Sequence, residues 1–408
     1  MSRTRGRGNG EGSLYQVTGG WRGYVWVTGP DGIRRRKYIK AITYEEARQK
    51  WLKLRNAATA GPVASNVPKL AEFLTYWLRE IVQPNLAPKT YEQYEMFTRL
   101  HIVPYLGSKR LDKLTARDVR QWLNRLQQVC QCCTQGKDAR RREAKRRCCA
   151  IGQCCHQVLS PRACRGARDT LRAALSYAIT EDELITRNPA AMVRLPSSRP
   201  RKIKAWSVAE ACRFLESART DHDPLYTAYV LMLVLGLRLG EVLGLPWGNV
   251  SLDTNELDVS WQLQRTGRRL HHRMTKTPGS DSTIPLPAIC ATALKLQAER
   301  QEAWQAKIGE AWQDSGLAVT TRYGTPVEPR NFLRSFGTRC RKAGVRYIKP
   351  HGMRRTCGSL LAALDVHPRV AMRILRHSKI AVTMEIYTDV PDDLTRDALR
   401  RLGEQFGS

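Results

Sequence analysis

The C-terminal half of the chain carries arginine, histidine and tyrosine side chains in short motifs that suit chemistry on a phosphate group. Arg238 lies in GLRLGE, and His351 and Arg354 lie three residues apart in HGMRRT. His377 follows in LRHS, and Tyr387 comes ten residues later in IYT. Arginine donates forked hydrogen bonds to phosphate oxygens, and a tyrosine hydroxyl can attack phosphorus once a base removes its proton. Each motif is weak alone, but the set predicts phosphoryl transfer.

The surrounding sequence predicts the helices that must position these groups. An apolar run over residues 228–237 leads into GLRLGE, so we expect Arg238 to lie inside a helix. An arginine buried there needs an anionic partner. Glu241, three residues later, either neutralises Arg238 or holds it towards a phosphate. Helical spacing also predicts that His351 and Arg354 share one helix face.

A small hairpin-rich sheet is predicted between these helices. Strand-like runs cover residues 256–264, 270–277 and 282–286, and PGSD at 278–281 is a turn signal. Lys276 lies next to this turn. A single lysine on a hairpin is usually a solubility residue, so its position alone assigns no role.

Taken in this order and at these separations, the motifs resemble those of the tyrosine recombinase (phage integrase) family, over the whole chain. The resemblance implies that Tyr387 attacks the DNA backbone and forms a 3′-phosphotyrosyl link. His351 would take the tyrosine proton, and Lys276 would protonate the departing 5′-hydroxyl. The groups implied around the scissile phosphate are Arg238, Lys276, His351, Arg354 and His377, with Glu241 in support.

The resemblance implies no cofactor for catalysis, and the sequence has no GxxxxGK[ST] motif. Arg355 and Cys357 vary the usual neighbourhood of the site, and two further positions depart from the family pattern. Arg376 stands where glycine is common, and Asp389 stands where histidine is frequent. Neither departure removes a catalytic group, but Asp389 adds a negative charge near the nucleophile.

The charge of the chain predicts a polyanionic partner. Its 408 residues include 68 Lys and Arg against 37 Asp and Glu, a formal net charge of +31. Such a surface repels itself unless a polyanion neutralises it, so nucleic acid is the first partner to expect. The family resemblance implies that this partner is double-stranded DNA, in core and arm attachment sites. The N-terminus has no apolar signal region, and no apolar run is long enough to span a bilayer. We therefore expect a cytoplasmic protein without a membrane partner.

The N-terminal residues 1–60 predict a small α+β module, and the resemblance implies that it binds arm-type DNA sites. Strand signals at 14–17, 24–27 and 37–39 precede a helix over 43–54, and a linker is expected at 56–68. Basic residues beside aromatic ones favour a sheet laid on DNA over a solvated sheet with aromatic packing. The predicted contacts are Arg34, Arg35, Arg36 and Lys37.

Two further domains are expected, which makes the fold class mainly α with small β-sheets. Residues 66–195 predict helices with a cysteine-rich insertion at 130–164, and the resemblance implies that they form a SAM-like core-binding domain. It likewise implies that residues 205–408 form a mixed α+β catalytic domain. The segment 194–204 reads as an extended basic linker along a phosphate backbone. Its predicted DNA contacts are Arg199, Arg201, Lys202 and Lys204.

Eight of the twelve cysteines fall between residues 130 and 164. Without an export signal disulfides are disfavoured, and thiolate and imidazole ligands suit structural zinc. The alternative is an insertion loop whose cysteines stay reduced and bind nothing. The candidate ligands are Cys130, Cys132, Cys133, Cys148, Cys149, Cys154, Cys155 and His156.

The family resemblance implies a homotetramer on two DNA sites that integrates or excises a mobile element, and it allows accessory DNA-bending or excision factors. A helix predicted over residues 392–406 either docks on a neighbouring subunit or packs on its own domain. Two other functions stay open at this point: a type IB topoisomerase that relaxes DNA alone, and a catalytically silent DNA-binding regulator.

Overall fold

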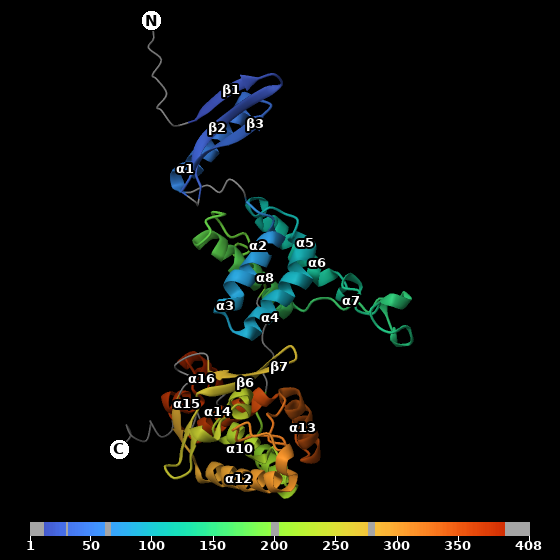
Figure 1. Cartoon of the computed structure of the whole chain (residues 1–408), viewed down its shortest axis with the longest axis vertical. Coiled ribbons are helices and arrows are strands. Elements are labelled where there is room, and N and C mark those ends of the chain that lie inside the picture. The colour runs from blue at the N-terminus through green and yellow to red at the C-terminus, as the bar shows by residue number, and fades with distance from the viewer. Residues whose placement is uncertain (1–11, 30–31, 62–66, 197–203, 276–281, 388–408) are drawn as a thin grey trace, which may run out of the picture. The chain divides into compact units, whose positions relative to one another are not determined.

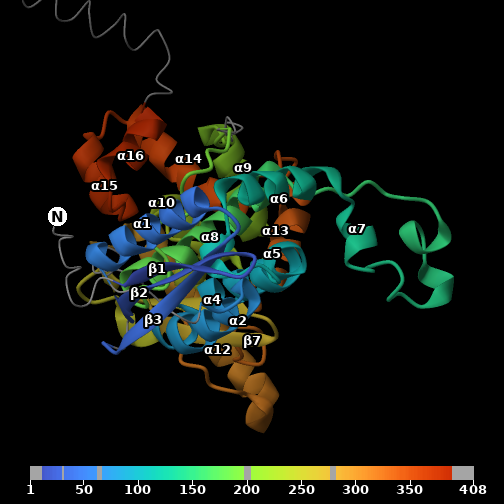
Figure 2. The same cartoon turned by 90° about the horizontal axis from the view of Figure 1, so that it is seen from above.

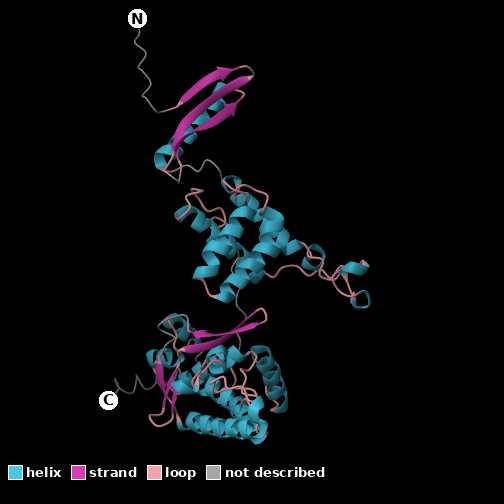
Figure 3. Ribbon diagram, in the orientation of Figure 1, coloured by secondary structure: helices cyan, strands magenta, loops and turns pink. Residues whose placement is uncertain are grey.

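The computed structural model describes residues 12–29, 32–61, 67–196, 204–275 and 282–387. The chain divides into two compact units, Met1–Arg199 and Pro200–Ser408 (Figure 1). The described residues are mainly helical with small sheets, as predicted (Figure 3). No helix in these ranges has both the length and the apolar character needed to cross a bilayer.

The first unit begins with a three-stranded antiparallel sheet of order β1-β2-β3 covered by one helix. Val25 and Val27 are buried on the covered face, as is Ala47 of the helix. Thr43 caps this helix by accepting from the Glu46 amide, as predicted. The helix ends later than residue 54 because RNAATA at 55–60 contains good helix formers, so the predicted linker starts too early. The elements are β1 (Ser13–Val17), β2 (Gly20–Thr28), β3 (Arg34–Ala41) and α1 (Tyr44–Ala60).

The rest of the first unit is a helical bundle. Trp77 stacks on Tyr94, and the Trp122 indole donates to the His101 carbonyl. Thr115 and Asp118 form the predicted capping box. The principal helical segments are α2 (Leu70–Tyr76), η1 (Trp77–Val82), α3 (Gln83–Asn85), α4 (Pro88–Phe97), η2 (Thr98–Ile102), α5 (Val103–Leu106), η3 (Leu111–Lys113), α6 (Ala116–Gln128) and α8 (Pro161–Thr180).

The chain between α6 and α8 leaves this bundle and projects away from it (Figures 1 and 2). It contains only a short helix and two 3₁₀ turns: α7 (Gln131–Thr134), η4 (Glu143–Lys145) and η5 (Cys149–Ile151).

The second unit packs helices around a large apolar core whose centre includes Tyr229, Phe214 and Phe332. Its helices are α9 (Val208–Thr220), α10 (Tyr226–Val234), α11 (Leu239–Leu243), η6 (Trp247–Asn249), α12 (Ala288–Ile308), η8 (Gly309–Ala311), α13 (Pro329–Lys342), α14 (Pro350–Ala363), α15 (Pro368–Leu375) and α16 (Ile380–Tyr387).

Two small sheets complete this unit. A three-stranded sheet has the order β4-β5-β8, and β6 pairs with β7 as a separate hairpin. The predicted strand over 256–264 is therefore split. Asn249 donates to both Asp258 and Ser260, and these side-chain bonds mark the break. The strands are β4 (Val250–Ser251), β5 (Glu256–Asp258), β6 (Trp261–Thr266), β7 (Arg269–Met274) and β8 (Thr283–Pro285).

Candidate active site

The GLRLGE motif lies at a break between two helices, so the expectation that Arg238 sits inside a helix is wrong. Helix α10 ends at Val234, and Arg238 is the extended N-cap residue of α11. Gly236 makes the turn at φ +60°, where a Cβ would come within 2.6 Å of the Leu375 side chain. This glycine lets the turn pack against the end of α15, and it aims Arg238 out of the apolar core.

Arg354 joins this turn to the end of α15. The side chain is 3% exposed, and it donates to the Gly236 carbonyl at 2.7 Å and to the Leu375 carbonyl. Burial and the positive charges of Arg238 and Arg376 lower the pKa of Arg354 to about 9. Such a depression marks a place where cations outnumber anions in a desolvated pocket.

Glu241 is the carboxylate that holds this cluster together. Its carboxylate bonds Arg238 Nη1 at 2.5 Å and the Arg238 amide at 2.8 Å, and it accepts from Arg376 Nη2 at 2.9 Å. Burial alone would raise the pKa of Glu241, but Arg376 and Arg238 outweigh burial and leave that pKa below its ordinary value. Two guanidinium groups thus bond one carboxylate, and Arg354 adds a third positive charge beside them, so cations outnumber anions at a site suited to an anion.

The same arginines affect the pKa values of the two predicted histidines, His351 and His377. Partial desolvation, then Arg354 and Arg238, lower the pKa of His351. The same causes lower the pKa of His377 to about 4. His377 Nδ1 lies 2.9 Å from the hydroxyl of Thr383, which is fully buried in α16. His351 and Arg354 share α14, as predicted.

Two members of the predicted set are not tested by this geometry. Tyr387 is the last residue of α16, and its side chain lies outside the described atoms. Lys276 lies outside the described residues, just after strand β7. Arg199, Arg201 and Lys202 also lie outside them, as do Asp389 and the predicted helix over 392–406. Lys204 is described and exposed.

Sequence reasoning did not give Arg376 or Thr383 a role. The sequence marks Arg376 only as a departure from glycine, yet its side chain is buried against Glu241. It caps α15 in the left-handed conformation, with φ 51° and ψ 51°. That backbone is the one glycine adopts readily, which was the available signal. Thr383 gave no signal, because its contact with His377 forms only in the fold.

The N-terminal sheet separates the four predicted arginine and lysine contacts onto two faces. Arg36 lies over the rings of Tyr24 and Trp26, with its guanidinium carbon 4.7 and 4.8 Å from their centroids. Arg34 also lies over Trp26. Strand alternation places Arg35 and Lys37, opposite Val27 and Val25 respectively, on the other side.

Seven of the eight predicted metal-ligand residues lie together. Their sulfur atoms form two groups of four, each of which could hold a metal ion. His156 belongs to neither group. Cys164, the eighth cysteine of the insertion, is buried in α8 and contacts the Leu159 carbonyl.

Both units match known families. Residues 69–127 match the family described as phage integrase, N-terminal SAM-like domain. Residues 207–393 match the phage integrase family. Together the two matches cover more than half of the chain.

The chain aligns with curated relatives over most of their length and of its own. The chain is 25% identical over 355 residues to a tyrosine recombinase XerC-like protein of Caldanaerobacter subterraneus subsp. tengcongensis, which covers 83% of each chain. It is 27% identical over 375 residues to an integrase of Streptomyces ambofaciens, covering 88% of this chain and 86% of the relative.

Solved structures show the same fold. The Tn1549 transposon integrase in complex with transposon right end DNA aligns with a TM-score of 0.61 at 21% identity, covering 82% of this chain and 99% of that one. A lambda integrase tetramer bound to a Holliday junction aligns with a TM-score of 0.54 at 16% identity, covering 93% and 96%.

The fold, the site and these relatives define a tyrosine recombinase, an enzyme of site-specific recombination. The chain belongs to the phage integrase family. The topoisomerase and the silent regulator are not favoured, because the relatives named here are integrases and tyrosine recombinases.

Proposed function

We propose that this protein cleaves and rejoins double-stranded DNA at specific sites, and so integrates or excises a mobile element. One observation carries the proposal: three arginines and two histidines lie close enough to shift one another's pKa values, and among the described residues Glu241 is the carboxylate that bonds two of those arginines. A phosphodiester is the anion that such a pocket fits, because forked donors can bond both non-bridging oxygens.

In the proposed reaction Arg238 and Arg354 bond the non-bridging oxygens of the scissile phosphate. The Tyr387 oxygen attacks phosphorus and forms the phosphotyrosyl bond as the bond to the 5′-oxygen breaks. His351 accepts the tyrosine proton, and Lys276 gives a proton to the leaving 5′-oxygen. A 5′-hydroxyl of the partner duplex then reverses these steps. The covalent link conserves the bond energy, so the proposal invokes no cofactor for catalysis.

His377 adds a hydrogen bond to the phosphate through Nε2. With its pKa near 4 in the DNA-free protein, the ring is neutral at pH 7. It can donate from Nε2 only if the proton sits there. A Thr383 hydroxyl that donates to Nδ1 would select that tautomer.

The N-terminal sheet is proposed to bind arm-type DNA. Arg34 and Arg36, held over aromatic rings, offer a cationic face to phosphates. The basic segment with Arg199, Arg201, Lys202 and Lys204 is proposed to follow the backbone of the core site. The Tn1549 integrase was solved with transposon DNA, which supports DNA as the partner. A DNA substrate also implies that the protein acts inside the cell.

The active assembly is proposed to be a homotetramer on two DNA sites; the lambda integrase was solved as a tetramer bound to a Holliday junction, which supports this assembly. An apolar cavity of about 710 Å³ in the second unit supports it; Leu233, Leu360 and Leu364 are among its lining residues. The sequence repeats Leu394, Ala398 and Leu402 at four-residue spacing. We propose that these three residues of one copy occupy the cavity of a neighbouring copy. Deleting residues 392–408 should abolish cooperative pairing of two sites, and unchanged pairing would refute the assignment.

The cysteine-rich insertion is proposed to hold structural zinc. Thiolates are preferred zinc ligands, and four of them complete a closed tetrahedral site. The zinc would order the insertion and take no part in strand cleavage.

A paired assay tests the function. Duplexes tiled across both ends of the element are supplied in pairs, beside a supercoiled plasmid without those sequences. Recombinant products from paired sites, without relaxation of the plasmid, are expected. Relaxation without recombinants would favour the topoisomerase, and binding without cleavage would favour the regulator.

A further inference from the structure

The cysteine loop, residues 130–158, has no apolar core of its own. Among the described residues, the core of the first unit has no fully buried member between Leu126 and Cys164. The loop buries sulfur and polar groups instead: Cys130, Gln131, Cys132 and Asp138. A loop this long inside a compact unit needs another source of order, since few contacts offset its conformational entropy.

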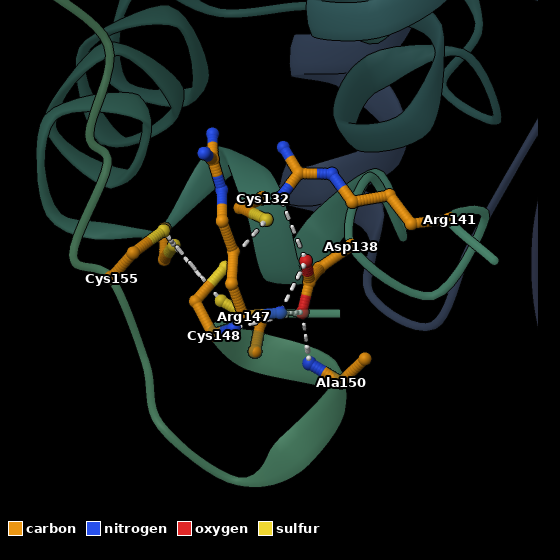
Figure 4. Close-up of polar contacts among 9 residues, drawn as sticks. Cys132, Asp138, Arg141, Arg147, Cys148, Ala150 and Cys155 are labelled. Carbon is orange, nitrogen blue, oxygen red and sulfur yellow. Dashed lines mark hydrogen bonds and ion pairs between the residues drawn. The ribbon is translucent and has the colours of Figure 1, made fainter. Parts of the chain in front are cut away.

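The side chain of Asp138 orders the backbone of one part of this loop. The residue is fully buried, and its carboxylate accepts from the backbone amides of Arg147, Cys148 and Ala150 at 3.0–3.3 Å. It also pairs with Arg141 Nη1 at 3.1 Å. Figure 4 shows the turn bent around this carboxylate, with Cys148 presented towards Cys132. These contacts fix the backbone that carries Cys148 and Cys149.

The spacing of the sulfur atoms matches a metal–thiolate cluster. Five Sγ pairs lie 3.7–3.9 Å apart. A disulfide would need about 2.05 Å, so these cysteines are reduced. A tetrahedron with zinc–sulfur bonds of about 2.3 Å has edges of about 3.8 Å. Four of the five pairs lie within one group of four sulfurs, and their separations are those of sulfurs that share a zinc ion. The fifth pair, Cys130 and Cys155, joins the two groups.

The sulfurs form two groups that share one member. The first group is Cys130, Cys133, Cys149 and Cys154; the second is Cys132, Cys148, Cys149 and Cys155. Within each group all ligand atoms lie within 4.8 Å of one another. Cys130 of the first group also lies 3.8 Å from Cys155 of the second. The two groups are thus contiguous parts of one cluster.

We infer that the cysteine loop binds two zinc ions in a single seven-thiolate cluster, with the Cys149 sulfur bridging both ions. Three further thiolates complete each tetrahedron. This cluster rests on the proposed zinc binding. It adds the number of zinc ions, the four ligands of each ion and the sulfur that the two ions share.

The charge of the loop supports the inference. Seven thiolates and two Zn²⁺ formally leave about three negative charges, which need nearby cations in a protein. The stretch from 137 to 147 supplies seven lysines and arginines against two acids. Part of this basic stretch would neutralise the cluster rather than hold DNA.

The test uses the full chain, purified with a reductant and loaded with zinc. Native mass spectrometry should find two zinc ions per chain. Loading with ¹¹³Cd instead should give two cadmium resonances split by coupling through the shared sulfur. This second measurement needs no variant, so it holds even if a variant misfolds.

Matched variants locate the bridge. Cys133→Ser removes a ligand of the first group only, and Cys155→Ser removes a ligand of the second group only. Each variant should therefore retain one tightly held ion. Cys149→Ser touches both groups and should lose tight binding of both ions. Cys212→Ser, an exposed cysteine outside the cluster, should keep two.

The outcomes separate the claims. One ion in the native chain, two uncoupled cadmium resonances, or two tight ions in Cys149→Ser would overturn the bridge while leaving zinc in place. No bound metal would overturn the zinc itself. The recombinase function is read separately, from covalent DNA adducts of the same preparation.

Discussion

The buried carboxylate of Glu241 accepts a hydrogen bond from Arg376 at 2.9 Å, although 135 residues separate the two in the chain. The same carboxylate holds Arg238. This contact ties the N-cap of α11 to the end of α15, and so it brings the first arginine of the site to the segment that carries His377. The pair organises a cluster in which positive charge exceeds negative charge.

Glu241→Gln should therefore be strongly destabilising. The amide keeps the shape but removes the carboxylate that Arg238 and Arg376 share among the described residues, so Arg376 loses its buried counter-charge. We expect the free energy of unfolding to fall by roughly 3–5 kcal/mol, measured by urea denaturation. Glu216→Gln removes an exposed ion pair with Arg219 and serves as the control, with almost no change expected. Equal effects in the two variants would contradict the role of Glu241.

Thr383→Val tests the proposed tautomer of His377. Valine keeps the buried volume but has no hydroxyl to donate a hydrogen bond to Nδ1 of His377. The fraction of His377 rings with the proton on Nε2 should therefore fall. We expect cleavage to slow about ten- to a hundredfold while DNA affinity is retained. Thr383→Ser keeps the hydroxyl and should cleave at close to the native rate. If the valine and serine variants cleave equally fast, Thr383 does not position His377.

Acid should destabilise the DNA-free protein through its histidines. Desolvation and neighbouring arginines hold the pKa of His377 near 4, whereas an unfolded histidine titrates near about 6.5. Between these pH values the unfolded chain binds more protons than the folded chain. The contribution of His377 to the free energy of unfolding is therefore fully present above about pH 6.5 and is lost as the pH drops towards 4. Denaturation at a series of pH values should show this slope, and His377→Gln should make it shallower. An unchanged slope in that variant would place the effect elsewhere.

Arg36 and Arg35 form a matched pair on opposite faces of the N-terminal sheet. Arg36→Ala should weaken binding to arm-site duplexes and reduce the slope of log affinity against log salt by about 1, since one phosphate contact is lost. Arg35→Ala, on the side of the buried Val27, should change the slope much less. Fluorescence anisotropy over a salt series measures both. The reverse order would show that the other face of the sheet meets DNA.

The catalytic motifs could be found in the sequence because the chemistry demands particular residue types. Arg354 cannot be exchanged for lysine where forked donors are needed, and helical spacing placed it beside His351 correctly. The helix starts at Thr43 and Thr115 were also predictable, because a capping residue acts on amides within the next turn.

Other features depend on contacts between distant segments. The apolar run before Gly236 favoured one continuous helix, whereas packing against Leu375 requires a turn there. Arg376 looked like a departure from a family pattern, and only its contact with Glu241 shows its role. The grouping of seven cysteines around Cys149 depends on a turn built by Asp138, which cysteine spacing does not encode.

Covalent trapping on nicked DNA tests the central claim most directly. Nicked duplexes tiled across the element's ends lose a short fragment after cleavage, so religation fails and the phosphotyrosyl link accumulates. The native chain should form a covalent adduct whose labelled peptide contains Tyr387. Tyr387→Phe should bind the same duplexes with similar affinity and form no adduct. An adduct formed by Tyr387→Phe, or a label on another residue of the native chain, would contradict this account.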